Sequence, residues 1–582
     1  MNALERGDVG AANALLDRHA DLKAEDQYGN SALMLATWHG DAALVKRLIA
    51  AGADVNHSNE FGATALHWAI DDTEKVKALL DAGADPNAQD QTETAPITLA
   101  AEREANTEVV TLMMEHGADA KLVGDRIGGD AATIPALIDH GASPKHALLF
   151  AAISGHTDSA KVLLDWHVDP NFTGALGMTT LMWASQMGYT DLVRLLLARG
   201  ANPNIVESLN KSTALMQAAS SDRASVELVQ ALLDAHADVT IADEEGATAL
   251  TWALRRGNPE VVAAIAAHVT NARPGPMRRP VGTLQPAPDP ITAMQRALPV
   301  LQKAGPTWLA SAGCPSCHHN ALPQMALAHA APFVAIDKPA IAKQTDYTSR
   351  FFTRFRERHL EGRGIDDIVE AGYLLFGLAA SNHAPDDTTA ALARYLELQQ
   401  SPDGRFAAQM QRQPADGSDV ALTAITIRVL QKYANAPQRI ARAREYLEKL
   451  APVTNEDICY RMLGLHWAGA VIDPKPLLDR QRPDGSWSQT DGLPGDVYAT
   501  AQAVVALREA ANVPAADLDR AKQFLLSHQY ADGSWFLASR ALRFQPFIDS
   551  GMPHGRSQYS SIIATSWAVM ALADLSPAVD VR

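Results

Sequence analysis

Two cysteines and two histidines lie together in the stretch 313–319, which reads Gly-Cys-Pro-Ser-Cys-His-His. Cys-x-x-Cys-His is the spacing at which c-type haem is attached to a protein chain. In that chemistry the thiols of Cys314 and Cys317 form thioethers with the haem vinyl groups, and His318 is an axial ligand of the iron. The spacing therefore predicts a c-type haem, with redox or haem-linked chemistry at these three residues.

The same residues allow other interpretations. The two cysteines could form a disulfide, they could supply half of a zinc site together with His318, or the segment could hold no cofactor. Zinc is not favoured, because the third cysteine, Cys459, lies far away in the sequence. The sixth ligand of a haem iron is also open, and the candidates are His319, Met325, His329 or a later residue.

The haem interpretation carries an expectation about location. Haem is attached to this motif outside the cytoplasm, so a haem-bearing chain is expected in the periplasm or another extracytoplasmic compartment, and a chain without haem in the cytoplasm. Residues 1–8 lack the basic start and apolar core of an export signal. We therefore expect the printed start to lie inside a longer gene product.

Length and charge restrict the classes of function. A chain of 582 residues is too long for one core, so several domains are expected. The net charge of −17 argues against nucleic acid as a partner, because binding to phosphates needs a basic face. No run approaches the ~18 apolar residues of a membrane span, so no transmembrane segment is predicted.

The first 270 residues repeat a six-residue phrase. Its copies begin with Ser, Thr, Ala or His and end with Ala, and they lie at 31–36, 64–69, 95–100, 146–151, 179–184, 213–218 and 248–253. Ser or Thr caps the first helix of a unit, and Gly-Ala-Asp or Gly-Ala-Asn makes the turn after the second. A period near ~33 residues with this phrase resembles the ankyrin repeat. The resemblance implies eight units, the first incomplete and one degenerate around 131–143, whose concave surface binds a protein partner.

A Pro-rich stretch separates this region from the rest. Six prolines between residues 272 and 291 interrupt any helix and predict a semi-stiff linker. The expected division is an ankyrin array at 1–270, a linker at 271–291, a helical segment with the Cys pair at 292–365, and a second repeat region at 366–582.

The second repeat region has a phrase of its own. Residues 400–406 read Gln-Ser-Pro-Asp-Gly-Arg-Phe, 481–487 read Gln-Arg-Pro-Asp-Gly-Ser-Trp, and 529–535 read Gln-Tyr-Ala-Asp-Gly-Ser-Trp. Asp-Gly makes a turn, the aromatic residue packs beneath it, and Gln can bond to a neighbouring helix terminus. A worn copy is expected near Leu450. The phrase resembles the QW motif of squalene–hopene cyclases and of the related prenyltransferase α/α toroid.

That resemblance implies an all-α chain, an ankyrin-repeat solenoid followed by an α/α toroid whose central cavity takes an isoprenoid or other hydrophobic ligand. The cyclases use an Asp-x-Asp-Asp acid, whose crowded carboxylates keep one proton available. The nearest matches are Ala-Pro-Asp-Asp at 384–387 and Asp-Gly-Ser-Asp at 416–419, so the resemblance carries the acid over to Asp387 or Asp419. Both matches are incomplete, and we favour helix capping for each pair.

Two further patterns have competing interpretations. Asp457-Ile458-Cys459 matches the Asp-x-Cys that holds zinc in protein prenyltransferases, but Ala499 stands where a His is expected. Cys459 is therefore interpreted as a buried apolar residue. In the polar loop 540–556, His554 and Asp549 could form an acid/base pair, or Arg543 and Asp549 could pin the loop, which we favour.

The whole arrangement resembles a class of bacterial ankyrin-containing proteins, and three functions are compatible with it. The first is an exported, haem-bearing scaffold that binds a protein through the ankyrin array and a hydrophobic ligand through the toroid. The second is a divergent enzyme of the terpene cyclase or prenyltransferase kind. The third is an interaction scaffold without a cofactor.

Overall fold

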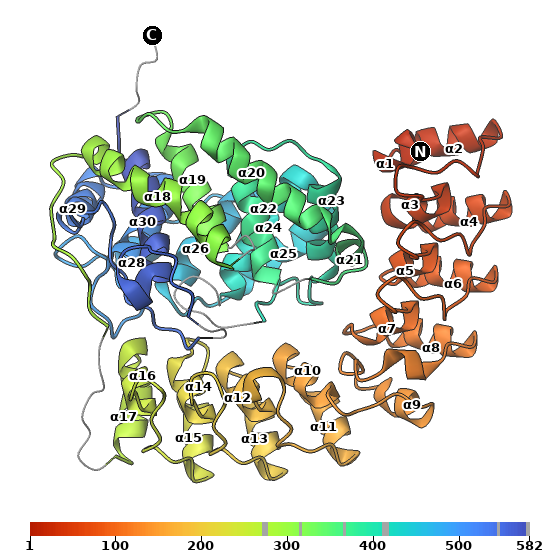
Figure 1. Cartoon of the computed structure of the whole chain (residues 1–582), viewed down its shortest axis with the longest axis horizontal. Coiled ribbons are helices and arrows are strands. Elements are labelled where there is room, and N and C mark those ends of the chain that lie inside the picture. Colours follow the sequence, from red (N-terminus) through yellow and green to blue (C-terminus); the bar gives the residue numbers. More distant parts are fainter. Residues whose placement is uncertain (270–277, 313–316, 365–367, 410–417, 544–546, 578–582) are drawn as a thin grey trace.

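The computed structural model describes residues 1–269, 278–312, 317–364, 368–409, 418–543 and 547–577. Within these ranges the chain is helical, and extended residues meet only in isolated bridges. No helix of the described chain is both long and apolar enough to cross a membrane. A repeat array (residues 1–269) runs along two sides of a helix ring (residues 290–577), as Figure 1 shows.

Each unit of the array is a pair of antiparallel helices. The first helices form the inner side, toward the ring, and are α1 (Asn2–Glu5), α3 (Ala32–His39), α5 (Ala65–Ala69), α7 (Pro96–Ala101), α10 (Ala147–Ser154), α12 (Thr180–Met187), α14 (Ala214–Ser220) and α16 (Ala249–Arg256). The second helices form the outer side and are α2 (Val9–Asp17), α4 (Ala42–Ala50), α6 (Thr73–Asp81), α8 (Thr107–Glu115), α9 (Ile134–Asp139), α11 (Thr157–Asp165), α13 (Thr190–Ala198), α15 (Val226–Asp234) and α17 (Pro259–Ala266). Short 3₁₀ turns are η1 (Ala120–Val123) and η2 (Ala175–Gly177).

Local hydrogen bonds explain why the repeated phrase starts a helix. The hydroxyls of Ser31, Thr179 and Thr213 each accept the backbone N–H three residues later, at 3.3, 3.1 and 3.4 Å. These are the predicted N-caps. Before the caps, isolated bridges such as Glu25–Ser31 and Ser58–Thr64 close the bases of four of the fingers, the loops that project between units.

The degenerate unit changes the direction of the array. It keeps the outer helix α9 but has no inner helix, and a Cβ on Gly129 would lie 2.5 Å from the carbonyl oxygen of Arg103. Without an inner helix to hold its neighbours apart, the array turns a corner here (Figure 1). The described array holds eight helix pairs plus α9, one unit more than the sequence predicts.

Six inner helices form a closed ring. They are α19 (Leu322–Ala330), α22 (Ile368–Ala380), α24 (Asp419–Tyr433), α26 (Asn455–Trp467), α28 (Val497–Arg508) and α30 (Gln558–Asp574). Each packs on the next, and α30 packs on α19. The outer helices are α18 (Pro290–Ala312), α20 (Lys338–Thr353), α23 (Asp387–Leu398), α25 (Pro437–Lys449), α27 (Lys475–Leu478) and α29 (Ala515–Ser527), with the short α21 (Arg356–Leu360), the π turn η3 (Cys317–Ala321) and the 3₁₀ turn η4 (Gly555–Ser557). The segment with the Cys pair, expected as a separate unit ending at 365, thus contributes α18 and α19 to the ring.

The Gln-Asp-Gly-aromatic turns join inner to outer helices. The side-chain amide of Gln529 donates to the carbonyl of Ala293 in α18 at 2.9 Å, which ties the last turn of the ring to its first helix. The backbone N–H of the buried Trp535 donates to a threonine hydroxyl of α30 at 3.0 Å. The copies at 400–406 and 481–487 make the matching bonds to their own helices.

Candidate interaction site between the array and the ring

Charged side chains line the contact between the inner side of the array and the ring, which we call the cis interface. The array contributes mainly acids: Asp71, Asp90, Asp222, Glu244 and Glu245. The ring contributes mainly arginines: Arg363, Arg394, Arg439, Arg540, Arg543 and Arg556. The two surfaces therefore complement each other in charge, which favours one mutual orientation.

Arg540 makes the most extensive of these contacts. It lies before α30, and its two terminal nitrogens donate to the two carboxylate oxygens of Asp222 at 2.9 Å each. Its Nε donates to the side chain of Gln489 at 2.8 Å. Burial lowers the pKa of Arg540, but the charge and hydrogen bonds of Asp222, together with the charges of Asp496 and Glu456, raise it above the ordinary value overall. A buried bidentate pair of this kind gives geometric specificity as well as energy.

Asp71 anchors the array at a second point. It lies between α5 and α6 and accepts hydrogen bonds from Arg394 of α23 at 2.7 Å and Arg439 of α25 at 3.4 Å. Burial raises the pKa of Asp71. The charge of Arg394 and its hydrogen bond, with the charges of the neighbouring arginines, lower it by more, so the net pKa lies below the ordinary value. The carboxylate is thus held in its charged form by the ring.

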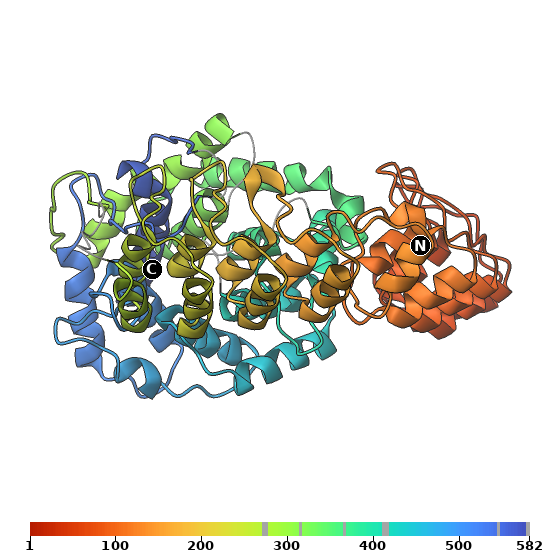
Figure 2. The ribbon, with the colours of Figure 1, turned by 90° about the horizontal axis from the view of Figure 1, so that it is seen from below.

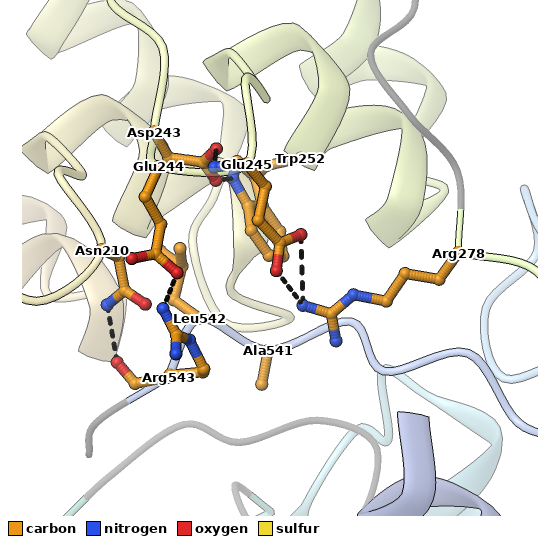
Figure 3. Close-up of a pocket in the computed structure, with 9 residues that line it drawn as sticks. All are labelled: Asn210, Asp243, Glu244, Glu245, Trp252, Arg278, Ala541, Leu542 and Arg543. Atoms are coloured by element: carbon orange, nitrogen blue, oxygen red, sulfur yellow. Dashed lines mark hydrogen bonds and ion pairs between the residues drawn. The ribbon is translucent and has the colours of Figure 1, made fainter. Parts of the chain in front are cut away.

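A small pocket lies where the last finger of the array meets Arg278 and the segment before α30 (Figure 3). Glu245 pairs with Arg278 at 3.2 Å and with Arg556 at 2.7 Å, and Glu244 pairs with Arg543. The empty space measures about 190 Å³, including its open mouth. Ion pairs occupy its walls, so we interpret it as a charged junction of three segments.

Apolar packing accompanies the charges. Leu360, Ala391 and Leu542 come from the ring side, yet they belong to the same buried cluster as the core of the array. They are 2%, 0% and 5% exposed. The cis interface therefore contains buried apolar contacts as well as charged pairs.

Asp419, one of the two predicted acids, lies at this interface. It is the first residue of α24 and forms an ion pair with Arg223 of the array. It also accepts the backbone N–H of Ala408 at 2.8 Å and lies 3.5 Å from Arg405. These partners use the carboxylate to join the halves, which favours a structural role.

Asp387, the other predicted acid, also contacts the array. It is exposed at the start of α23 and accepts hydrogen bonds from the Gln27 amide at 2.9 Å and the Tyr28 hydroxyl at 3.0 Å. The guanidinium of Arg356 lies 4.0 Å above the ring of Tyr28. Asp387 and Asp419 are therefore not brought together; they contact opposite ends of the array.

The residues before these two acids are the predicted caps. Asp386 accepts the backbone N–H of Thr389 at 2.8 Å, and Ser418 accepts that of Ala421 at 3.0 Å. Burial raises the pKa of Asp386, but the bonds from Thr389 and His383 bring it below the ordinary value. The capping interpretation is confirmed for both residues.

The Cys-x-x-Cys-His motif lies partly outside the described residues. Cys314 falls in the gap at 313–316, and of Cys317 and His318 the structure describes only the backbone, which begins the π turn η3 between α18 and α19. The next residue, His319, is fully buried and stacks on Trp308 with centroids 4.8 Å apart.

The other proposed iron ligands have different surroundings. Met325 is buried in the core of the ring, and Nδ1 of His329 lies 3.5 Å from a carboxylate oxygen of Asp574. Within the described residues, no group of three or more His, Cys, Asp or Glu side chains is placed to hold a metal ion.

Asp457 and Cys459 have structural partners. Asp457 accepts the backbone N–H of Val453 and of Thr454 at 3.1 and 3.0 Å and the Ser418 hydroxyl at 2.6 Å. Cys459 is buried, and burial raises the pKa of its thiol well above the ordinary value. Asp457 is thus a capping residue, and Cys459 is the predicted buried apolar one.

The loop 540–556 is pinned through Arg543, as predicted, but the partner of Arg543 is Glu244 of the array, and Asp549 bonds within the loop. His554 contacts the backbone N–H of Val281 at 3.2 Å and the Ser534 hydroxyl at 2.9 Å, while Asp549 accepts the N–H of Gly551 at 2.9 Å. Arg543 pairs with Glu244 of the array. The sequence drew attention to this loop. Its partner Glu244 lies about three hundred residues earlier, on a finger of the array, and belongs to no recognisable motif.

The family model described as ankyrin repeats matches this chain in three copies, at residues 1–90, 127–207 and 203–275. Among curated proteins, the bovine mitochondrial disaggregase is 30% identical over 142 residues, which is 18% of this chain and 21% of that protein. Human ankyrin repeat and SOCS box protein 6 is 32% identical over 155 residues, covering 22% of this chain and 37% of that protein. These matches span well under half the length of either relative.

Among solved structures, the ankyrin repeat domain of human ASB11 is 25% identical and covers 42% of this chain and all of that domain, with a TM-score of 0.29. The family model shows ankyrin repeats at residues 1–90 and 127–275, and the curated relatives are ankyrin-repeat proteins in part. Ankyrin repeats imply a protein-interaction scaffold.

Proposed function

We propose that this chain is an interaction scaffold whose ankyrin array recognises the helix ring of the same chain. The observation that carries the proposal is the row of acid–arginine pairs across the cis interface, among them the bidentate Arg540–Asp222 pair. Ankyrin arrays bind proteins through their concave side. Here that side faces the ring, so an external protein partner competes with the ring for the same surface.

The test uses the full chain with a protease site placed in segment 271–277. After purification and cleavage, we expect the two halves to elute together from gel filtration at low salt. Removing one partner of a buried ion pair costs about 3–5 kcal/mol, because the other charge is left buried. Asp222→Asn or Arg540→Met should therefore weaken the association at least roughly a hundredfold.

The matched control is Lys46→Met, which removes an exposed ion pair with Glu74. Exposed pairs contribute little, so this variant should associate as the unchanged protein does. Separation of the unchanged halves at low salt would show that the array does not hold the ring.

We further propose that Cys314, Cys317 and His318 carry a c-type haem, which would supply redox or ligand-binding chemistry at its iron. The motif spacing supports this, and so does the π turn that starts at Cys317, because such turns are frequent at functional sites. Attachment would place the chain outside the cytoplasm.

A pyridine haemochrome spectrum tests the haem. The chain is made with an added export signal in cells with a cytochrome c maturation system, and a variant with Cys314→Ala and Cys317→Ala is the control. A c-type spectrum present only in the unchanged chain is expected. A featureless spectrum with both cysteines intact removes haem and leaves the cofactor-free scaffold.

The resemblance of the ring to cyclase and prenyltransferase toroids remains a proposal about its fold and its ligand. It is supported by the closed order of the inner helices and by the three Gln-Asp-Gly-aromatic turns. If the ring turns over an isoprenoid, Asp419 or Asp387 is the candidate acid.

A further inference from the structure

Two carboxyl groups meet across the cis interface. Asp90 lies on the finger before α7, and Glu361 directly follows α21. Nη1 of Arg363 lies 3.9 Å from a carboxylate oxygen of Asp90 and 3.9 Å from one of Glu361, so the two carboxyl groups are neighbours. Glu361 is 1% exposed and Asp90 is 9% exposed, so both carboxyl groups are shielded from solvent.

The two groups differ in their hydrogen bonds. Asp90 accepts the backbone N–H groups of Thr92 and Thr94 at 2.8 Å each, as an anion would. Neither oxygen of Glu361 has a hydrogen-bond donor among the described residues. Arg363 lies 3.9 Å from one oxygen of each carboxyl group, but its Nη1 donates to the hydroxyls of the two threonines at 2.8 and 2.6 Å.

The remaining charged groups do not satisfy Glu361 as an anion. Glu357 in α21 adds a further negative charge, and Arg358 of the same helix contributes a positive one. Arg103 of the array donates to the backbone carbonyl of Glu361 at 3.1 Å, not to its side chain. Burial, followed by the charge of Asp90, raises the pKa of Glu361 well above its ordinary value, although Arg363 acts in the opposite direction.

Two buried carboxyl groups in contact are satisfied when one of them keeps a proton, because its O–H can then donate to the other. We propose that Asp90 and Glu361 share one proton across the cis interface, and that docking of the array on the ring takes up this proton from solvent. The inference rests on the proposed cis docking and adds its pH dependence. On undocking, Glu361 becomes hydrated and releases the proton to water.

The sign follows from linkage. Docking binds a proton, so it is strongest near and below the ordinary glutamate pKa of 4.5 and weakens as the pH rises toward the raised pKa of docked Glu361. Over that interval the ratio of undocked to docked molecules should rise by up to roughly tenfold per pH unit.

Hydrogen exchange with mass spectrometry on the full chain tests this from about pH 5 to about pH 8. At each pH the opening of cis-interface peptides in the unchanged chain is divided by that in Glu361→Gln, which cancels the pH dependence of intrinsic exchange. We expect this ratio to rise with pH. Asp90→Asn should remove the rise independently, and Glu102→Gln, an exposed acid of the array paired with Arg126, should leave it intact.

The outcomes separate the two proposals. A ratio that stays constant with pH in both variants overturns the shared proton. Slower opening on addition of calcium, seen in the unchanged chain and lost in Glu361→Gln, would also overturn it, because the pair would then hold a cation. Fast exchange of the interface peptides at every pH, with the rest of both halves protected, would instead show that cis docking fails.

Discussion

The motif suggests that Asp419 is an acid catalyst, but its side chain makes structural ion pairs and a hydrogen bond. At the residue scale, its carboxylate is occupied by Arg223 of the array, by Arg405 and by the N–H of Ala408. An acid catalyst needs a carboxyl group whose proton faces a substrate. The contact with the array instead places this group at the boundary between the halves.

We expect Asp419→Asn to lower the free energy of unfolding by about 3–5 kcal/mol, because Arg223 loses the anion that compensates its burial. Chemical denaturation of the full chain measures this. Asp403→Asn, whose exposed carboxylate lies 3.5 Å from Arg405, is the matched control with a small effect. If Asp419→Asn instead keeps its stability and abolishes turnover of an isoprenoid, the acid assignment is correct.

His554 predicts a pH effect on stability. Burial lowers its pKa, and its ring contacts the N–H of Val281 and the hydroxyl of Ser534. The folded chain therefore binds fewer protons here than the unfolded chain, so this stability is present above the ordinary pKa of 6.5 and is lost as the pH falls below it.

The variant for this test is His554→Asn, because residue 554 has a φ of 71° and Asn tolerates that left-handed region. Thermal unfolding between about pH 7.5 and about pH 5.5 should show a smaller loss of Tm in the variant than in the unchanged chain. Parallel losses would mean that His554 is not the titrating group.

At the scale of elements, the Gln-Asp-Gly-aromatic turns hold the ring together because each bonds to an inner and an outer helix. Gly533 has a φ of 87°, and a Cβ there would lie 1.9 Å from the carbonyl oxygen of Arg296 in α18. The turn therefore needs glycine for two reasons, backbone conformation and the close approach of a helix.

Gly533→Ala should destabilise the chain by roughly 2 kcal/mol more than Gly469→Ala. Gly469 has a φ of 81° but no atom within 4 Å of an added Cβ, so it carries only the conformational cost of about 1–2 kcal/mol. Urea unfolding of the two variants gives the comparison. Equal losses would show that α18 yields to the extra methyl group.

At the scale of the whole molecule, the array and the ring are held by charges of opposite sign and by buried apolar contacts. The corner at α9 divides the array into two rows, α1 to α8 and α10 to α17. Figure 2 shows the second row lying across the ring when seen from below. The ion pairs between Asp71, Asp222 or Glu245 and the arginines are spread along both rows. We therefore expect salt to weaken docking along the whole interface at once.

Raising the salt concentration from about 0.1 to about 1 M shortens the Debye length from ~10 to ~3 Å and weakens the partly exposed pairs. We expect small-angle X-ray scattering to show a larger radius of gyration at high salt, while circular dichroism shows that both halves stay helical. An unchanged radius would mean that the apolar contacts of Leu360, Ala391 and Leu542 are sufficient alone.

The sequence by itself determined the elements that depend on local physics. Ser31, Thr179 and Thr213 cap helices because their hydroxyls reach an N–H three residues away, and that spacing is visible in the repeated phrase. The same holds for the caps at Asp386 and Ser418. The c-type haem, whose first cysteine lies outside the described residues, stays a prediction.

Only the tertiary structure decided which distant residues meet. Arg540 and Asp222 are 318 residues apart, and their contact requires both the corner of the array at α9 and the closure of the ring. No local pattern encodes such pairs, because an acid on a finger and an arginine before a helix are common surface residues until the fold brings them together and excludes water.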